Sequence, residues 1–346
     1  MSRLSASEDA SERDAQRAAS TELVLANRLA NRHATGKSSH RTQMMTMPTY
    51  TPYAGPTRPF TIGVSALDPH QWIETDGDLG RYLDEKQQLA KSHYDDIVRV
   101  ASDTGQAQQE CLDLLVEHLL TDHATHYRRH GNTMEMAGHS VDLSDETVPP
   151  IVRAGSLIAD DLVLLRKKED GWTIVAAHLA FPSSWSLAEK FNQPMDQVHA
   201  TVPGFQGGTR NAVLVNRIFD NLQPAVPAKR FNWSINWTYA LYHPVSLRPP
   251  SDPLSTGVSA ANAFIRVERQ SLRKLPVSGD IVFTIRIYLD PLKALIDQPD
   301  GGALAAKLAE QLESLTPDEV NYKGLAEKRD DLVRCLRQAD LAAITV

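Results

Sequence analysis

The sequence is poor in cysteine, with only Cys111 and Cys335 among 346 residues, which excludes a disulfide framework and a metal site built from cysteine alone. It has no run of 18 apolar residues, so we expect no membrane-spanning helix. It also lacks the GxGxxG and GxxxxGK[ST] motifs that cradle dinucleotides and phosphates. Basic residues are not in excess: 36 Lys and Arg against 43 Asp and Glu give a net charge of −7, which argues against a nucleic-acid-binding protein.

What remains is an ordinary globular composition, 42% hydrophobic and 23% charged. The low cysteine content favours a reducing compartment, and with no secretory h-region in view we expect a cytoplasmic protein. Residues 1–48 are rich in Arg, Ser and Ala, which also suits an organellar transit peptide, but their five acidic residues argue against one. We expect residues 1–48 to be a disordered tail with a short helix over Glu22–Arg32.

The rest of the chain divides into three segments. Residues 49–155 are interpreted as an N-terminal extended and helical segment, residues 156–292 as the core, and residues 293–346 as C-terminal helices. The strongest helix is expected at residues 110–120, ECLDLLVEHLL, where Leu112, Leu115, Val116 and Leu119 share one stripe. Pro317 is expected to begin a later helix.

Two weaker expectations concern the N-terminal segment. The spacing of Ile97, Val100 and Ala101 predicts a short amphipathic helix, and residues 131–155 are interpreted as a loop. The run His123, His126 and His130 suggests a metal site, but the neighbouring arginines would repel a cation, and a solvated helix end is favoured.

The core segment predicts five strands: 161–166, 172–181, 230–237, 263–272 and 280–289. Short helices, the first capped by Ser183 or Ser184, are expected between the second and third strands. Two strands, a helical crossover and three strands can close a five-stranded antiparallel sheet with short helices on one face. The sequence therefore predicts an α+β, PAS-like fold with N- and C-terminal helical extensions, and a pocket between the layers that suits a flat ligand.

Two stretches carry a specific resemblance to a known family. Residues 178–204 contain the runs Phe-Pro-Ser-x-Trp-x-Leu-x-x-Lys and His-x-x-Val-Pro, and residues 266–287 contain Arg-x-Glu-Arg-Gln-x-Leu-x-x-Leu-Pro-x-Ser. These blocks resemble those of the haem-dependent oxidative N-demethylase alpha-subunit-like family, over roughly residues 50–300. The resemblance implies a PAS fold that carries haem b. It also implies oxidation of a small secondary amine, such as dimethylamine, to a primary amine and formaldehyde.

Haem needs an axial donor, usually a neutral imidazole outside thiolate enzymes. His199, at the end of a short helix in the place where haem PAS domains carry their ligand, is the predicted axial ligand of the haem iron. His178, on the second strand, is the rival ligand or a residue of the distal pocket. Either histidine can instead be a core residue hydrogen-bonded to backbone. The thiols of Cys111 and Cys335 lie outside the predicted core and are interpreted as packing or surface residues.

Charged residues recur within the predicted strands. Arg266, Glu268 and Gln270 alternate onto one face, where their burial is costly unless they are paired. In a haem pocket Glu268 would hold a cationic amine and an arginine would meet a haem propionate; the alternative is a cross-strand ion pair with Arg286. The candidate catalytic residues are Glu268, Arg266 and His178, and the candidate cofactor-binding residues are His199, Arg230, Asn232, Trp233, Arg269 and Lys190.

The partners follow from what the chemistry requires. Haem oxidation of an amine needs O2 and electrons, yet the sequence holds no flavin or nicotinamide fingerprint and no cysteine set for an iron–sulfur relay. We therefore expect a separate flavin or iron–sulfur reductase polypeptide, a small amine substrate, and neither a nucleic acid nor a membrane as partner. The alternative function is a non-catalytic haem PAS sensor, which the lack of a recognisable output domain in this sequence disfavours.

Overall fold

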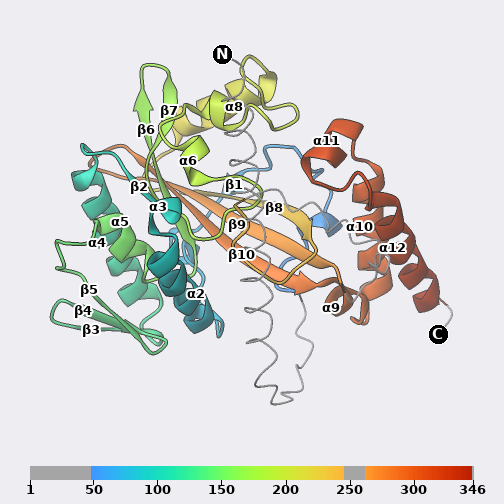
Figure 1. The fold of residues 1–346 in the computed structure, drawn as a ribbon, viewed down its shortest axis with the longest axis horizontal. Coiled ribbons are helices and arrows are strands. Elements are labelled where there is room, and N and C mark those ends of the chain that lie inside the picture. Colours follow the sequence, from blue (N-terminus) through green and yellow to red (C-terminus); the bar gives the residue numbers. More distant parts are fainter. Residues whose placement is uncertain (1–47, 245–261, 345–346) are drawn as a thin grey trace, which may run out of the picture. The chain divides into compact units, whose positions relative to one another are not determined.

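The computed structural model describes residues 48–244 and 262–344 (Figure 1). The expected tail and its short helix lie outside these residues, apart from residue 48 itself. Within the described residues the chain forms a mixed α+β structure built around a large antiparallel sheet, as the sequence predicts. None of the helices there is long and apolar enough to cross a membrane.

The large sheet has seven strands in the order β1-β8-β9-β10-β6-β7-β2, all paired antiparallel. Their bounds are β1 (Ser65–Ala66), β2 (Val98–Val100), β6 (Asp161–Lys168), β7 (Gly171–His178), β8 (Ala228–Asn236), β9 (Phe264–Lys274) and β10 (Ile281–Pro291). The five predicted strands correspond to β6 to β10 and are contiguous in the sheet. The prediction of a five-stranded sheet is corrected, because β1 and β2 add one strand at each edge.

Strand β2 also corrects the helix expected around residues 97–101. This stretch is the end of α3 (Tyr94–Ile97) followed by β2. Tertiary pairing overrides the local pattern: the Leu179 amide donates to the Ile97 carbonyl at 2.8 Å, and the Ala101 amide donates to the Val175 carbonyl at 2.9 Å. A strand of three residues carries too little periodicity to be recognised from sequence.

The register of the sheet assigns its side chains to two faces, because successive residues of a strand point to opposite sides and paired residues to the same side. Face A is the side that carries the paired residues Asn232, Glu268 and Ile287. Face B is the side that carries their neighbours Trp233, Val267 and Tyr288.

Helices pack on both faces. The sequence predicted short helices of the core on one face and left open the side taken by the N- and C-terminal extensions. On face B lies α2 (Leu79–Ser92), whose Tyr82 ring is 4.0 Å from the Arg286 guanidinium carbon. Also there is α5 (Pro150–Gly155), whose last residue packs against His178. On face A lies α8 (Arg210–Asn221), where the Phe219 ring is 5.9 Å from that of Trp172.

The region expected to be a loop holds a second sheet and a helix. Strands β3 (Tyr127–His130), β4 (Thr133–Met136) and β5 (His139–Asp142) form a three-stranded antiparallel sheet, and α5 follows. Gly131 and Gly138, with φ of 59° and 81°, form the two tight turns that the short strands require.

Two helical segments of the structure agree largely with the helices predicted from the sequence. The predicted helix at residues 110–120 lies within α4 (Gly105–Asp122), and its leucine stripe is buried. The C-terminal segment forms α9 (Leu292–Ile296), α10 (Gly301–Glu313), α11 (Pro317–Tyr322) and α12 (Arg329–Ile344), and Pro317 begins α11 as predicted. Figure 1 shows α10 and α12 side by side, and their leucines join Ile265 and Val267 of face B in a second apolar cluster.

The remaining short elements are η1 (Pro52–Ala54), η2 (Pro69–Gln71), α6 (Leu187–Lys190) and α7 (Met195–Val198). The cap of α6 is Ser186, not Ser183 or Ser184. The Ser186 hydroxyl accepts from the Glu189 amide, and the Glu189 carboxylate accepts from the Ser186 amide, which is the reciprocal pattern of a capping box.

Candidate functional site

Polar side chains gather on face A of strands β8 and β9. The register places Arg230 opposite Gln270 and Asn232 opposite Glu268, while Arg266 lies two residues before Glu268 on the same strand. Because all five residues belong to one face, the structure brings together four of the candidate site residues: Arg230, Asn232, Arg266 and Glu268.

Glu268 is held by three side-chain donors. Its Oε2 accepts from Asn232 at 3.2 Å and from Gln270 at 2.9 Å, and its Oε1 accepts from Arg266 at 3.3 Å. The Glu268 side chain is 13% exposed. A carboxylate has about four acceptor positions, so about one remains for a further donor. The arrangement is a fixed carboxylate with room for one more hydrogen bond.

The guanidinium of Arg266 is buried and hydrogen-bonded to neighbouring protein groups. Its side chain is 1% exposed, Nη2 donates to the Phe181 carbonyl at 2.7 Å, and Nη1 donates to the Leu241 carbonyl at 3.2 Å. These bonds tie β9 to the segment after β7 and to the segment after β8. Because the guanidinium of Arg266 is buried and hydrogen-bonded to protein groups, it holds the Glu268 side chain in place.

The alternative pairing of this cluster with Arg286 is corrected by the register. Arg286 lies opposite Arg269 on face B, and its Nη2 donates to the Asp76 carboxylate at 2.6 Å. The sheet itself therefore separates Arg286 from Glu268.

His199 directly follows α7, and its backbone amide donates to the Met195 carbonyl at 2.9 Å. Its ring lies 6.0 Å from that of Phe205, and no residue in the described part of the chain hydrogen-bonds its imidazole. Burial lowers the pKa of His199 to about 4, and the charges of Arg230 and Lys190 act in the same direction. The imidazole is therefore neutral near pH 7, with a nitrogen lone pair available.

Lys190 completes this part of the site. Its ammonium donates to the Val198 carbonyl at 2.8 Å, which fixes it across the α6–α7 turn next to His199. An ammonium has three donors, so this bond leaves others for a second partner.

A cavity of about 480 Å³ begins two residues after His199. It lies between the turn that follows α7 and helix α11, and its volume is within the usual range for a small-molecule site. The lining residues are Thr201, Pro203, Gly204, Gln206, Asp318, Asn321 and Tyr322.

Lys323, which follows α11, is a site residue that sequence reasoning missed. Its Nζ donates to the Trp233 carbonyl at 2.6 Å and lies 4.8 Å from the centroid of the Trp233 ring. Burial lowers its pKa to about 8, although the charge of Glu268 opposes this. No motif surrounds Lys323, so only the tertiary fold could reveal its contact with Trp233.

Three candidate residues do not lie with this cluster, because strand alternation sends them to face B. Arg269, 1% exposed, donates from Nη1 to the Trp72 carbonyl at 3.0 Å. Trp233 packs with its ring 6.1 Å from that of Tyr53. His178 also belongs to face B, since it is paired with Leu162 and packs against Gly155.

His178 sits in a tightly packed interior. A Cβ added at Gly155 would lie 2.1 Å from its Nδ1, and neither ring nitrogen has a hydrogen-bond partner in residues 48–244 and 262–344. Burial lowers the pKa of His178 to about 3, and the nearby Lys86 charge adds to the effect. Lys86 itself donates to the Gly155 carbonyl at 2.9 Å and to the Ile158 carbonyl at 3.0 Å. The sheet separates this histidine from His199.

The histidines around residues 123–130 serve local structure. His123 ends α4, and its Nε2 lies 3.0 Å from the Ile73 carbonyl; His130 belongs to β3, with Nε2 3.7 Å from the Glu135 carboxylate. Within the described ranges there is no group of three or more His, Cys, Asp or Glu suited to a metal ion. Cys111 is fully buried in the core, and burial raises the pKa of its thiol to about 12.

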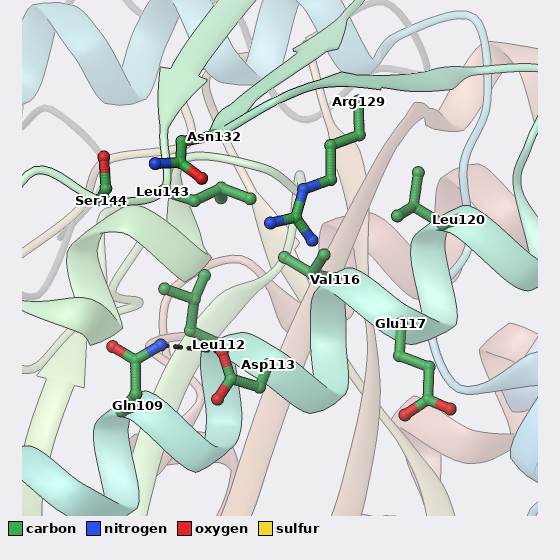
Figure 2. A pocket seen from close by; sticks show the side chains of 10 residues that line it. All are labelled: Gln109, Leu112, Asp113, Val116, Glu117, Leu120, Arg129, Asn132, Leu143 and Ser144. Atoms are coloured by element: carbon green, nitrogen blue, oxygen red, sulfur yellow. Dashed lines mark hydrogen bonds between the residues drawn. The ribbon is translucent and has the colours of Figure 1, made fainter.

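A second cavity, of about 400 Å³, lies between α4 and the three-stranded sheet (Figure 2). Figure 2 shows the Arg129 side chain reaching from β3 over Val116, and Gln109 hydrogen-bonded to Asp113 at 2.8 Å. None of the candidate site residues lines this cavity, so it is distinct from the face A cluster.

A family model described as haem-dependent oxidative N-demethylase, alpha subunit-like, matches residues 63–333, well over half of the chain. The matched range includes the face A cluster, the His199 turn and Lys323.

Proposed function

Because this chain belongs to the haem-dependent oxidative N-demethylase alpha-subunit-like family, we propose that it binds haem b on face A and oxidises a small secondary amine there. For dimethylamine the balanced reaction consumes O2, two electrons and two protons, and yields methylamine, formaldehyde and water. The electrons come from a separate flavin or iron–sulfur reductase polypeptide, and the cytoplasm, which suits two unpaired cysteines, is the proposed compartment.

The observation that carries this proposal is the state of His199: a neutral imidazole without a hydrogen-bond partner in the described residues, near the charges of Arg230 and Lys190 and two residues before the turn that lines a cavity. This is the donor chemistry that haem iron requires, and Arg230 and Lys190 are suited to its two propionates. The residues present therefore fit haem. Bound haem would supply the redox chemistry with O2.

The fold supports the same placement. The contiguous strands β8-β9-β10-β6-β7, with α6, α7 and α8 inserted between β7 and β8, have the order expected of a PAS-like core. His199 lies in the inserted helical segment, and the carboxylate cluster lies on face A.

In this proposal Glu268 binds the substrate. Its carboxylate lies at the centre of the cluster, and its remaining acceptor position suits the N–H of a protonated amine. It can then accept a proton from the amine nitrogen before oxidation. Asn232, Gln270 and Arg266 orient the carboxylate, so Arg266 acts as a positioning residue. His178, on face B, has no part in this site.

The test is reconstitution of the purified protein with haemin, followed by aerobic incubation with dimethylamine and a chemical reductant. We expect a Soret band and release of formaldehyde and methylamine in equal amounts. A protein that binds no haemin would contradict the proposal. A haem-loaded protein that releases no formaldehyde would favour the non-catalytic sensor instead.

A further inference from the structure

Lys323 has donors that the described protein does not use. An ammonium group carries three N–H donors, and Lys323 gives one to the Trp233 carbonyl. The rings of Trp233 and Phe60, at 4.8 and 5.1 Å, cover part of the charge. No carboxylate among the described residues forms an ion pair with it. Lys323 is half-buried, so its two remaining donors are open to a bound partner.

Arg230 is in the same situation. Its Nε is buried without a hydrogen-bond partner in residues 48–244 and 262–344, and its one protein contact is a long bond from Nη2 to the Thr61 carbonyl, 3.4 Å. Arg230 and Lys323 reach neighbouring residues of one segment, because Arg230 bonds the Thr61 carbonyl and the Lys323 Nζ lies 5.1 Å from the centroid of the Phe60 ring. In agreement with this contact, the charge of Arg230 lowers the pKa of Lys323. Two cations with unused donors therefore lie on one side of the site.

The carboxylate whose charge acts on both cations, that of Glu268, does not supply the missing partner. Glu268 is bonded to Asn232, Gln270 and Arg266 and forms no ion pair with Lys323. Glu319 accepts from the Thr316 amide at 2.8 Å in the cap of α11. A carboxylate placed between Arg230 and Lys323 would accept hydrogen bonds from both cations.

We infer that Lys323 and Arg230 form an anion-binding pair that holds a carboxylate of the cofactor, one haem propionate. The inference rests on the proposed function and extends it, because it makes helix α11 a part of the cofactor site. The C-terminal segment is then required to retain the cofactor, although the sequence suggested an extension outside the core.

The experiment compares haemin with haemin dimethyl ester, whose propionates carry no charge, in spectroscopic titrations of the full-length protein. We expect K323M to raise the Kd for haemin about tenfold, which corresponds to one hydrogen bond to a charged group, and to leave the Kd for the ester unchanged. K323R, which keeps the charge, should bind haemin nearly as the wild type does. K307M is the matched control, since Lys307 is an exposed lysine of the same segment paired with Glu310.

Equal weakening for haemin and for the ester would show a structural effect and overturn the inference. An unchanged Kd for haemin in K323M would also overturn it, while leaving the proposed function intact as long as the wild type binds haemin. A wild type that binds neither compound would overturn both. If K323M fails to fold, a K323R protein with the wild-type preference for haemin over its ester supports the inference, and loss of that preference contradicts it.

Discussion

Asn232 and Glu268 lie directly opposite each other on β8 and β9, and the Asn232 amide donates to the Glu268 carboxylate at 3.2 Å. Since Gln270 and Arg266 also donate to this carboxylate, its position is set before any substrate arrives. A carboxylate fixed in this way can recognise a cation without first giving up rotamer freedom. The account of substrate binding depends on this pairing.

Removal of the charge at this position should weaken amine binding. Glu268→Gln keeps the size of the side chain, so we expect haem occupancy close to that of the wild type. The Kd for dimethylamine should rise about tenfold or more, because a charged hydrogen bond is lost. The measurement is the amine-induced change in the absorption spectrum of haem-loaded protein. Glu189→Gln, which alters an exposed helix cap, is the control. An amine Kd within about twofold of the wild type would refute this role.

Loss of the Arg266 guanidinium should act mainly on stability. Arg266→Met leaves the Phe181 and Leu241 carbonyls without their donor and Glu268 without its ion pair. We expect the free energy of unfolding to fall by about 3 kcal/mol, measured by urea denaturation. Arg334→Met removes an ion pair whose arginine side chain is 65% exposed and should cost about 0.5 kcal/mol or less. Similar values for the two variants would show that Arg266 does not tie these segments together.

Much of the core fold could be predicted because its strands are long and alternate regularly. The run Ile281, Phe283, Ile285 and Ile287 predicted β10 almost to its bounds. Strand β1 has two residues and β2 three, too few to show a period, and they form only because β8 and β7 offer them a partner. The small sheet β3-β4-β5 was missed for the same reason.

The site was predicted in part. Alternation correctly grouped Arg266, Glu268 and Gln270 and put Arg269 on the other face, but the register between β8 and β9 was needed to show that Trp233 shares the face of Arg269. The face of His178 likewise depends on pairing with β6. Lys323 could not be found from its neighbours in the sequence, because it reaches Trp233 across 90 residues of the chain.

Because His178 is buried, we expect it to make the free energy of unfolding fall at acidic pH. Its pKa of about 3 in the folded chain lies below its ordinary 6.5, so on acidification the unfolded chain binds the proton first, and stability falls as the pH falls through 6.5. Between about pH 7.5 and pH 5 this histidine alone should cost the wild type about 2 kcal/mol.

The check is the free energy of unfolding as a function of pH for His178→Leu. Its decrease towards pH 5 should be about 2 kcal/mol smaller than in the wild type. His130→Gln, at a histidine whose side chain is 68% exposed, should keep the wild-type profile. Parallel profiles for His178→Leu and the wild type would contradict the burial of a neutral imidazole at this position.

Gly155 of α5 packs against His178 of β7, so we expect substitutions at these two positions to have non-additive effects on stability. Gly155→Ala places a methyl group 2.1 Å from the His178 Nδ1 if nothing moves, so we expect a loss of about 1 to 3 kcal/mol from overpacking. In G155A/H178A the added methyl has room, so the double variant should be less destabilised than the sum of the single variants. Gly77→Ala, with nothing within 4 Å of the new Cβ, is the control. Additive losses in denaturant unfolding would contradict this packing.

The central claim is that His199 holds haem iron on face A. The most direct measurement is the absorption spectrum of haemin-reconstituted wild type, His199→Ala and His178→Leu, recorded at equal protein concentration. We predict a Soret band in the wild type, its loss or a clear shift in His199→Ala, and an unchanged band in His178→Leu. A His199→Ala protein with full haem occupancy and the wild-type spectrum would contradict the account.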